Sequence, residues 1–495
     1  VAVDLPVAVG FCMLIRRACL DSVGLFDVAT WGRGYGEEVD FCLKARALGW
    51  RHVAAADAFV VHRGSVSFGD EKRERILESA RKIAERYPFY DGLVQRFIAA
   101  DPLAPARRAI DLALIREALE GERVLHVSHD FGGGTERHLR AAAAAERAAG
   151  AAPLVLRFAA SGEAGLEIAL ADTPLAGLYA DRHVLRYRAG EAAALEADLA
   201  GLGIARVRLH GPVGVPPGML NWLRARFPLE VTVHDYAWIC PRVTLTRSGG
   251  EYCGEPAAAG CAACVAVDGA HPGTRALLDA ADGDVAAYRA ELLGLLNDAA
   301  AVRTGVHDVA ERLARHGVSR AVDVIPHDDD ETAPTADAPA PAPLVPGERV
   351  RVALFGALSE IKGHRLLLAC ARHAEEAGLA LGFIVFGHTQ DDAAYAGLAN
   401  VTITGRYQEE ALDALVARFR PHVGFFPGGA PETYSYTLSH AMRLGLPAAV
   451  RDIGALAERV RAARAGVVLP LDAEPPEICR ALGELAAGAH PGHAA

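Results

Sequence analysis

The strongest constraint on the fold of this 495-residue chain is a regular alternation of short apolar strands with longer helical stretches. The alternation starts at Arg123 with RVLHVSHDF, passes through a glycine turn, and enters the helical stretch TERHLRAAAAAERAAG. Further strands are predicted at residues 152–159, 205–211, 229–235, 300–305 and 321–327. Strands that alternate with helices are typical of a parallel sheet in an α/β fold. Residues 122–327 are therefore predicted to form a doubly wound, Rossmann-like domain.

The same alternation returns after a linker. Residues 328–348 are acidic and then rich in proline and alanine, a composition typical of a semi-extended connection. Beyond the linker, strands are predicted at residues 350–357, 381–388, 400–405, 422–428 and 447–452. Residues 349–485 are thus predicted to form a second Rossmann-like domain. Two such domains leave a cleft between the carboxyl ends of their strands.

The composition excludes several classes of protein. Hydrophobic residues make up 51% of the chain and charged residues 23%, which is typical of a folded protein with a large core. The net charge of -11 provides no basic field for a nucleic acid. No apolar run of about 18 residues occurs, so we expect no transmembrane helix and at most peripheral membrane contact. Most cysteines are scattered singly, which favours a reduced protein in the cytoplasm or at the inner face of the cytoplasmic membrane.

A group of three carboxylates, Glu37, Glu38 and Asp40, follows a glycine turn at a predicted helix start. The helix dipole stabilises acidic groups there, so the group is either a plain N-terminal cap or a functional cluster. His62 ends the predicted strand FVVH, and a carboxylate base with a histidine ligand for a divalent ion is a coherent pair. Residues 101–121 have apolar side chains at helical spacing and are predicted to form a bridging helix.

The segments GYGEEVDF and FVVH resemble the C-terminal half of an inverting glycosyltransferase family 2 domain. The resemblance implies a partial GT-A α/β domain over residues 1–100, with Glu38 as the base for the acceptor hydroxyl and His62 as a metal ligand. The nucleotide-binding half of that family would lie before residue 1, and a chain that begins at Val1 is expected to start inside a longer reading frame. Without that half, Glu38 and His62 are expected to be silent. Mg²⁺ or Mn²⁺ would be needed only if the missing half were present.

Two motifs in the first Rossmann-like domain are predicted to face the cleft. Gly132, Gly133 and Gly134 precede a helix N-terminus, whose backbone N–H groups suit a phosphate or a closely approaching sugar. A triple glycine also occurs in plain strand-to-helix turns that need tight packing. His234 and Asp235 follow a β-branched strand; a lone histidine in such a place is more often structural than catalytic.

Two motifs in the second Rossmann-like domain carry candidate polar groups. Lys362 precedes Gly363 at a predicted helix start, where its ammonium could hold a diphosphate as a point charge. An ordinary surface lysine is the equally weighted alternative. In the segment FFPGGAPETYSYTLSHAMRLGLP, Glu432 could accept sugar hydroxyls, and the helix start after Pro431 could receive phosphates. The plain alternative is that Glu432 caps the helix.

These four motifs together resemble glycosyltransferase family 4, which contains retaining enzymes of GT-B fold. The resemblance covers residues 122–470 and implies a pair of doubly wound domains with no metal required at the GT-B site. The family pattern is Glu, seven residues, Glu. Glu432 matches the first Glu, which contacts the donor sugar, and His440 stands where the second binds the nucleotide ribose. An arginine that often precedes the lysine in the family is absent, since residues 356–358 are Gly-Ala-Leu.

The resemblance also assigns roles in a reaction. Lys362 and the helix start would stabilise the leaving diphosphate. Glu432 would orient the donor sugar, and His234 would contact that sugar. The glycines 132–134 would allow the phosphate end of the donor to approach closely. A sugar would pass with retention from a UDP-, GDP- or dTDP-sugar to a glycan or lipid-linked acceptor. The pathway implied is bacterial surface polysaccharide biosynthesis of the O-antigen or capsule type.

Two alternatives stay open. The substitution at His440 and the missing arginine favour a non-catalytic glycan-binding or assembly module derived from glycosyltransferases, whereas the retained Lys362 and Glu432 disfavour it. A nucleotide-dependent oxidoreductase is weaker, because the glycine turn lacks the G-x-G-x-x-G pattern.

Four of the nine cysteines cluster in the first Rossmann-like domain. They are Cys240, Cys253, Cys261 and Cys264. A C-x₂-C pair with two further cysteines nearby predicts a structural zinc site, although the gaps differ from those of the commonest zinc ribbons. The alternative is a loop with four reduced, buried thiols.

Overall fold

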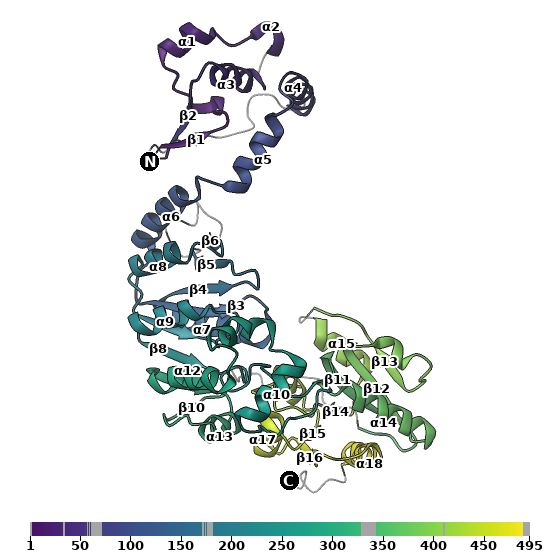
Figure 1. Cartoon of the computed structure of the whole chain (residues 1–495). Coiled ribbons are helices and arrows are strands. Elements are labelled where there is room, and N and C mark those ends of the chain that lie inside the picture. Colours follow the sequence, from purple (N-terminus) through teal and green to yellow (C-terminus); the bar gives the residue numbers. More distant parts are fainter. Residues whose placement is uncertain are drawn as a thin grey trace. The chain divides into compact units, whose positions relative to one another are not determined.

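The computed structural model describes residues 2–32, 35–56, 58, 60, 72–170, 173, 175, 182–327, 343–408 and 411–488, apart from the side chains of 72–74. The chain divides into two compact units, Val1–Ala118 and Leu119–Ala495 (Figure 1). Each unit is described by itself. Among the described residues, no helix is long and apolar enough to cross a membrane.

The first unit is mainly helical. Its strands β1 (Ala2–Leu5) and β2 (His52–Ala55) pair antiparallel. Its helices are α1 (Arg17–Val23), α2 (Val28–Trp31), α3 (Glu37–Ala47), α4 (Lys72–Arg86), α5 (Tyr90–Ala100) and α6 (Ala104–Ala118). Helix α6 confirms the helix predicted near residues 101–121. Among the described residues of this unit the sheet has only these two strands, so the partial GT-A domain stays a prediction.

The first α/β domain of the second unit is built on an eight-stranded sheet with the order β10-β9-β8-β7-β3-β4-β5-β6. The strands are β3 (Arg123–His129), β4 (Ala152–Phe158), β5 (Ala164–Ala169), β6 (Arg182–Tyr187), β7 (Arg206–Leu209), β8 (Leu229–Thr232), β9 (Ala301–Thr304) and β10 (Asp323–Val324). The helices are α7 (Gly133–Ala148), α8 (Ala192–Gly201), α9 (Pro217–Arg226), α10 (Ala258–Asp268), α11 (Arg275–Ala280), α12 (Val285–Asp298) and α13 (His307–Arg315). All six strands predicted in this domain are confirmed.

One edge of this sheet differs from the prediction. Strands β5 and β6 were not predicted, and β4–β5 and β5–β6 pair antiparallel. The connection 159–163 is a tight turn in which the Ala159 amide donates to the Glu163 carbonyl at 2.9 Å. A parallel partner would need a crossover of a dozen or more residues, so this short turn permits only a hairpin. The expectation of a wholly parallel sheet is therefore wrong at this edge.

Among its described residues, the second α/β domain has six strands, all parallel, in the order β13-β12-β11-β14-β15-β16. The strands are β11 (Val350–Leu358), β12 (Leu381–Thr389), β13 (Val401–Ile403), β14 (Val423–Phe426), β15 (Ala448–Arg451) and β16 (Gly466–Leu469). The helices are α14 (His364–Glu376), α15 (Leu412–Phe419), α16 (Tyr436–Arg443), α17 (Gly454–Ala463) and α18 (Pro475–Ala486). The five predicted strands are confirmed, and β16 is additional.

Both faces of this sheet are buried, which explains why its strands read as nearly continuous apolar runs. Successive side chains of a strand point to opposite faces. Val352 and Leu354 of β11 accordingly belong to one core cluster, while Ala353 and Phe355 belong to the other. The helical layers on the two faces therefore have separate cores.

The strand order reverses direction once in each sheet. In the first domain the reversal lies between β3 and β7, and in the second it lies between β11 and β14. Ligands of open α/β sheets bind beyond the carboxyl ends of the strands at such a point. The topology therefore locates a candidate site in each domain before any side chain is considered.

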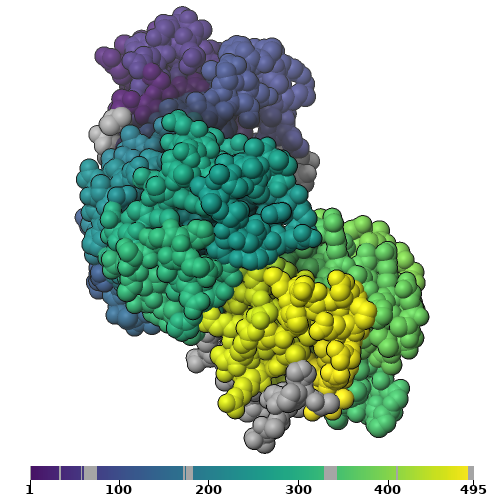
Figure 2. All heavy atoms as spheres, turned by 60° about the horizontal axis from the view of Figure 1, so that its bottom comes forward, coloured from purple at the N-terminus to yellow at the C-terminus, as the bar shows by residue number. Residues whose placement is uncertain are grey.

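The two α/β domains of the second unit are in direct contact. The amides of His307 and Asp308, at the start of α13, each donate to the Glu458 carboxylate of α17 at 2.8 Å. The hydroxyl of Tyr434 donates to the carbonyl of His327 at 2.8 Å. Figure 2 shows the atoms of the last helices, in yellow, adjoining those of the first α/β domain, in teal and green.

A close backbone approach between β11 and β12 generates the first prediction. Gly387 has φ +135°, and a Cβ at this position would lie 2.0 Å from the carbonyl oxygen of Gly356. Gly387→Ala is therefore expected to lower the free energy of unfolding by at least about 1–3 kcal/mol. The midpoint of urea unfolding, followed by circular dichroism, measures this loss.

Gly483→Ala is the matched control. Gly483 lies within α18, and a Cβ added there would meet no atom within 4 Å. Alanine there should raise the free energy of unfolding by about 0.5–1 kcal/mol. Equal midpoints for the two variants would contradict the account of Gly387.

Candidate functional site

A cavity of about 480 Å³ lies at the junction of the two α/β domains of the second unit, and we call it the junction site. Its lining comes from the carboxyl-end loops of both sheets: Gly134, Thr135, His234, Asp235, Tyr236, Val243, Thr244 and His327 from the first domain, and Ser359, Ile361, Lys362, Ala430, Pro431, Glu432, Thr433, Tyr434, Ser435, Tyr436 and Thr437 from the second. The volume falls within the range of about 300–1,000 Å³ that is usual for small-molecule sites. The junction site is therefore large enough for a sugar with part of its carrier.

The glycine turn after β3 has two separate roles. Gly132 and Gly133 both have φ +76°, which few other residues adopt, and they turn the chain into α7. Neither lines the junction site, whereas Gly134 does. A Cβ on Gly134 would lie 3.1 Å from the ring of Tyr436, so the small residue preserves space between the two domains.

His234 and Asp235 follow β8 and both line the junction site, as predicted for His234. The ring nitrogen Nε2 of His234 lies 3.1 Å from Nδ1 of His210. The carboxylate of Asp235 accepts a hydrogen bond from the Ala237 amide at 2.8 Å. Burial raises the pKa of Asp235 to about 6, well above the ordinary value for aspartate.

The second domain contributes the charged pair Lys362 and Glu432. The Lys362 ammonium lies 3.5 Å from Oε1 of Glu432, and both side chains line the junction site. The residue after Lys362 must be glycine, because Gly363 has φ +83° and a Cβ there would lie 2.5 Å from the backbone of Pro427. The Lys-Gly pair is thus explained by packing against the loop that follows β14.

The loop that carries Glu432 is held at its backbone. The Glu432 carbonyl accepts a hydrogen bond from the Ala455 amide at 2.9 Å. A Cβ on Gly454 would lie 2.8 Å from Pro431 and from the Glu432 nitrogen, so α17 begins in contact with this loop. The Glu432 side chain is therefore presented from a fixed backbone.

Ser435 carries backbone strain at the rim of the junction site. Its φ of +93° is unusual for a residue with a side chain. Arg459 stabilises this conformation, because its guanidinium donates to the Ser435 carbonyl at 2.8 Å and to the Ser439 hydroxyl at 2.7 Å. It also lies 4.0 Å from the centroid of the Tyr434 ring. Strained residues held in this way cluster at functional sites.

The helix expected after Pro431 is α16. Helix α16 starts at Tyr436, after the irregular segment 430–435, which confirms a helix start after Pro431. The positive φ of Ser435 prevents an earlier helix start. Tyr436 and Thr437 still line the junction site, so the first turn of α16 borders it.

His440 lies outside the lining of the junction site. Its Nδ1 accepts a hydrogen bond from Arg443 at 2.9 Å, and its ring packs edge-on against Phe355. Burial, together with the charge of Arg443, lowers the pKa of His440 to about 4, so the ring is neutral near pH 7. A contact of His440 with a nucleotide ribose stays a prediction.

Two contacts made by residues that line the junction site were not found by motif. Arg137 of α7 lies 4.8 Å from the centroid of the Tyr436 ring. Thr433 donates to the His234 carbonyl at 2.6 Å. Neither contact joins residues at a recognisable spacing, so only the folded chain reveals them.

The four clustered cysteines line a second cavity, of about 260 Å³. All four are reduced, and Cys261 accepts a hydrogen bond from Arg289 at 2.9 Å. Among the described residues, the group of metal-binding side chains whose ligand atoms all lie within 4.8 Å of one another is His138, His210 and His234, and it contains no cysteine. Zinc binding by the cysteines stays a prediction.

The carboxylates of the first unit lie at the start of α3, as predicted. Asp40 is buried and contacts Lys44 at 2.6 Å, Arg86 at 3.0 Å and the Tyr87 hydroxyl at 2.7 Å. Burial alone would raise its pKa, but the bonds from Lys44 and Tyr87 lower it overall. Asp40 therefore anchors α4 to α3. The expected ligand His62 lies outside the described residues, so its pairing with Glu38 remains a prediction.

Comparison with known proteins identifies the second α/β domain. Residues 349–487 match the family model of glycosyl transferases group 1. No match is found among curated proteins. The C-terminal region is therefore a glycosyltransferase domain, and the chain is an enzyme of the glycosyltransferase class. The two Rossmann-like domains that meet at the junction site form a GT-B-type arrangement.

Solved structures that are similar to this chain include the following three. Sucrose-phosphate synthase from Thermosynechococcus elongatus is 19% identical, with a TM-score of 0.48, over 75% of this chain and 92% of that chain. Anabaena HepE in complex with UDP-glucose is 15% identical, with a TM-score of 0.46, over 75% of this chain and 93% of that chain. A glycosyltransferase from Rickettsia africae is 11% identical, with a TM-score of 0.45, over 74% and 91% of the two chains.

The raised pKa of Asp235 generates a prediction for stability. Because the folded state holds this proton more tightly than the unfolded state, Asp235 contributes stability that is present below about pH 4 and is lost as the pH rises through about 6. A difference of about two pKa units corresponds to roughly 3 kcal/mol. Asp235→Asn should remove this part of the pH dependence. Urea unfolding at several values from pH 4 to pH 7 measures it.

Asp298→Asn is the control, because Asp298 is on the surface in an ion pair with Arg224. Parallel stability profiles for the parent chain and the Asp235→Asn variant would contradict the assignment.

Proposed function

We propose that the chain transfers a sugar with retention from a nucleotide-sugar donor to a glycan or lipid-linked acceptor. The observation that carries the proposal is the Lys362–Glu432 pair, 3.5 Å apart, at the strand-order reversal of the glycosyltransferase domain. Both groups line a cavity that the other α/β domain closes. A donor bound to one domain would thus meet an acceptor bound to the other.

Charge stabilisation of the leaving group is the main task of such a site. Breaking the bond between sugar and diphosphate leaves negative charge on the diphosphate, and fixed positive groups lower that barrier. Lys362 would supply a full charge, and the first turn of α16 would supply backbone N–H groups beside it. The family-typical arginine is absent from residues 356–358, so Lys362 would carry most of the charge from that part of the site.

Glu432 would have two roles. Its carboxylate would accept hydrogen bonds from hydroxyls of the donor sugar. It also pairs with Lys362 at 3.5 Å, which orients the ammonium within the junction site. His234 and the small Gly134 would border the sugar from the opposite domain.

The donor nucleotide is proposed as UDP, GDP or dTDP, and the pathway as bacterial surface polysaccharide biosynthesis. No metal is required by this proposal at the junction site, since Lys362 and the helix turn would take the place of a metal. Glu38 of the first unit is proposed to have no part in this reaction.

The first experiment measures donor binding by thermal shift. A nucleotide that binds only the folded state stabilises it by RT ln(1 + [L]/Kd), about 2.7 kcal/mol at 100 Kd. UDP, GDP and dTDP are compared, followed by the corresponding sugars with a glycan acceptor. Absence of stabilisation by all three nucleotides would favour the non-catalytic glycan-binding alternative.

Lys362→Ala is expected to reduce turnover by about 10²–10³, the usual cost of removing one group that stabilises a transition-state oxyanion. Glu432→Ala should lose activity on a similar scale because the donor sugar is no longer oriented. Initial rates with the identified donor measure both losses.

Arg365→Ala is the matched control for Lys362→Ala. Arg365 lies three residues along the same segment, its side chain is 73% exposed, and it pairs with Glu360. This variant should retain parent activity. Full turnover in both Lys362→Ala and Glu432→Ala would show that the junction site is not the donor site.

The cysteine cluster is proposed to hold a structural zinc ion. A four-cysteine site would bring about one equivalent of zinc into chain purified without chelator. The measurement is metal analysis of the parent chain and of a Cys261→Ala, Cys264→Ala double variant. Equal zinc in the two preparations, or none in the parent, would refute the proposal.

A further inference from the structure

Five histidines gather at and beside the wall of the junction site. His126 lies in β3, His210 and His234 follow β7 and β8, His138 lies in α7, and His327 follows β10. His126 and His210 are fully buried. Their rings are neighbours, with centroids 5.2 Å apart for His126 and His210, and 5.4 Å apart for His210 and His234. Such a concentration of imidazoles in one core requires a physical explanation.

A hydrogen-bond chain fixes the tautomers of these rings. Nε2 of His126 lies 2.7 Å from Oε2 of Glu146, whose other oxygen pairs with Arg208 at 3.0 Å. The pKa of Glu146 would be raised by burial, but the bond to His126 and the nearby arginines lower it overall, so the group is an acceptor. His126 therefore donates from Nε2, and as a neutral ring it accepts at Nδ1.

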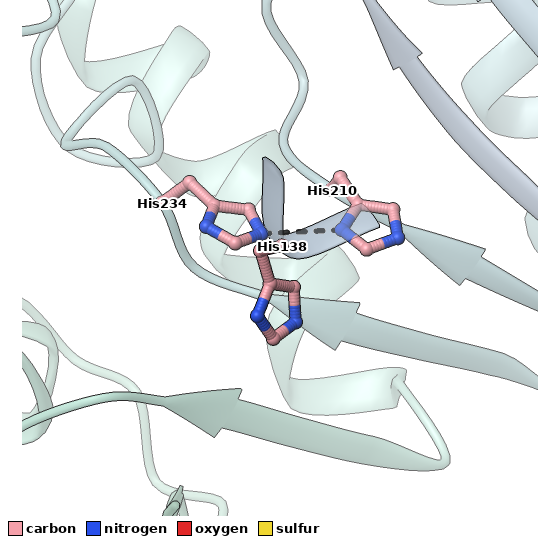
Figure 3. Close-up of side chains that lie close together, drawn as sticks. All are labelled: His138, His210 and His234. Carbon is pink, nitrogen blue, oxygen red and sulfur yellow. Dashed lines mark hydrogen bonds between the residues drawn. The ribbon is translucent and has the colours of Figure 1, made fainter. Parts of the chain in front are cut away.

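The tautomer of His210 follows from its hydrogen bond to His126. Nδ1 of His126 lies 3.0 Å from Nε2 of His210, so His210 donates from Nε2 and has a bare lone pair on Nδ1. That lone pair points toward Nε2 of His234, 3.1 Å away (Figure 3). A carboxylate and a second imidazole behind a histidine are the kind of outer partners that orient a metal-ligating histidine.

His138 completes a group of three. One ring nitrogen from each of His138, His210 and His234 lies within 4.8 Å of the others. The three rings come from different elements, and Figure 3 shows the His210–His234 hydrogen bond with the His138 side chain beside it. We propose that His138, His210 and His234 form a binding site for a divalent transition metal such as zinc.

The ring spacing fits this proposal. Zinc–nitrogen bonds of about 2.0–2.1 Å in a tetrahedron place imidazole centroids roughly 5 Å apart. The observed separations are 5.4 Å for His210–His234, 4.9 Å for His138–His234 and 5.7 Å for His138–His210. Small side-chain shifts would therefore bring three nitrogens to ligand distance. Imidazole ligands suit zinc, copper, nickel and cobalt rather than magnesium or calcium.

Metal binding would leave the number of protons on His210 and His234 unchanged. Metal binding requires neutral imidazole. Burial lowers the pKa of both His210 and His234 well below the ordinary histidine value. On binding, His210 would use its bare Nδ1, while His234 would release Nε2 and carry its proton on Nδ1. No net proton is gained or lost by this exchange of tautomers.

The site goes beyond the proposed sugar transfer, because two of its three residues, His138 and His210, do not line the junction site. A metal there would hold His234 in one orientation and one tautomer. The competing explanation is that the contact between His210 and His234 is only a hydrogen bond in a metal-free core.

Cobalt titration of the full-length chain tests the proposal. The chain is prepared without a histidine tag and in the Cys261→Ala, Cys264→Ala background, so that the cysteine cluster does not contribute. We expect about one equivalent of Co²⁺ to bind saturably, with ligand-field bands, without thiolate charge transfer, and with displacement by Zn²⁺. Absence of saturable binding would overturn the proposal.

Variants separate this site from other histidines. His138 is only partly buried, so His138→Ala is the primary variant; His210→Gln is the second, with its fold checked by circular dichroism. Both should abolish the titration, whereas His373→Ala in α14 of the other domain should not change it. Unchanged Co²⁺ binding in His138→Ala and His210→Gln would place the metal elsewhere and refute the assignment.

Glu146→Gln tests the partners behind the three ligands. Loss of such an outer partner typically weakens metal affinity 10–100-fold. Glutamine keeps the shape of Glu146 but removes its charge, so the Zn²⁺ dissociation constant from equilibrium dialysis should rise by that factor. An unchanged constant would contradict the role assigned to the Glu146–His126 chain.

Discussion

The junction site depends on two hydrogen bonds that cross between the α/β domains. Thr433 donates to the His234 carbonyl at 2.6 Å and Tyr434 donates to the His327 carbonyl at 2.8 Å. Both donors belong to the loop that also carries Glu432, and both acceptors follow strands of the opposite sheet. The distance between the walls that the two α/β domains contribute to the junction site is therefore set by the same short loop that presents Glu432. A change in this loop would alter the shape of the cavity and the position of Glu432 together.

Most of the strands and helices of the α/β domains could be predicted from the sequence, because they depend on local patterns of apolar residues and glycines. Buried parallel strands need nearly continuous apolar runs, and the turns between strands and helices need glycine where φ is positive. Strands β5 and β6 escaped prediction because the prediction relied on strands alternating with helices, and no described helix separates β4, β5 and β6. Gly132–Gly134 were predicted to admit a phosphate or a sugar, with tight packing as the alternative; Gly132 and Gly133 have positive φ, and only Gly134 lines the cavity.

The candidate site could be predicted only in part. Lys362, Glu432 and His234 stand in motifs with a characteristic spacing, and the structure brings all three to one cavity. Arg459, which holds the strained Ser435, has no such spacing, and neither does the histidine group. The members of that group come from α7 and from the ends of β7 and β8, whose proximity follows from sheet order rather than from distance along the chain. The order of strands in the sheet brings these distant residues together, and a local sequence pattern cannot predict that.

The charged side chains that line the junction site favour anion binding by backbone N–H groups. Its lining contains one ammonium, Lys362, against the carboxylates of Glu432 and Asp235. At mildly acid pH the Asp235 carboxyl is partly protonated and so carries less negative charge, because burial raises its pKa to about 6. A diphosphate could not be held by net charge alone in such a cavity. The first turns of α7 and α16 both border it through Gly134, Thr135, Tyr436 and Thr437, and helix N-termini offer unpaired N–H groups to anions. The absence of the family-typical arginine is thus compatible with anion binding, because two helix starts and one lysine converge on the same space.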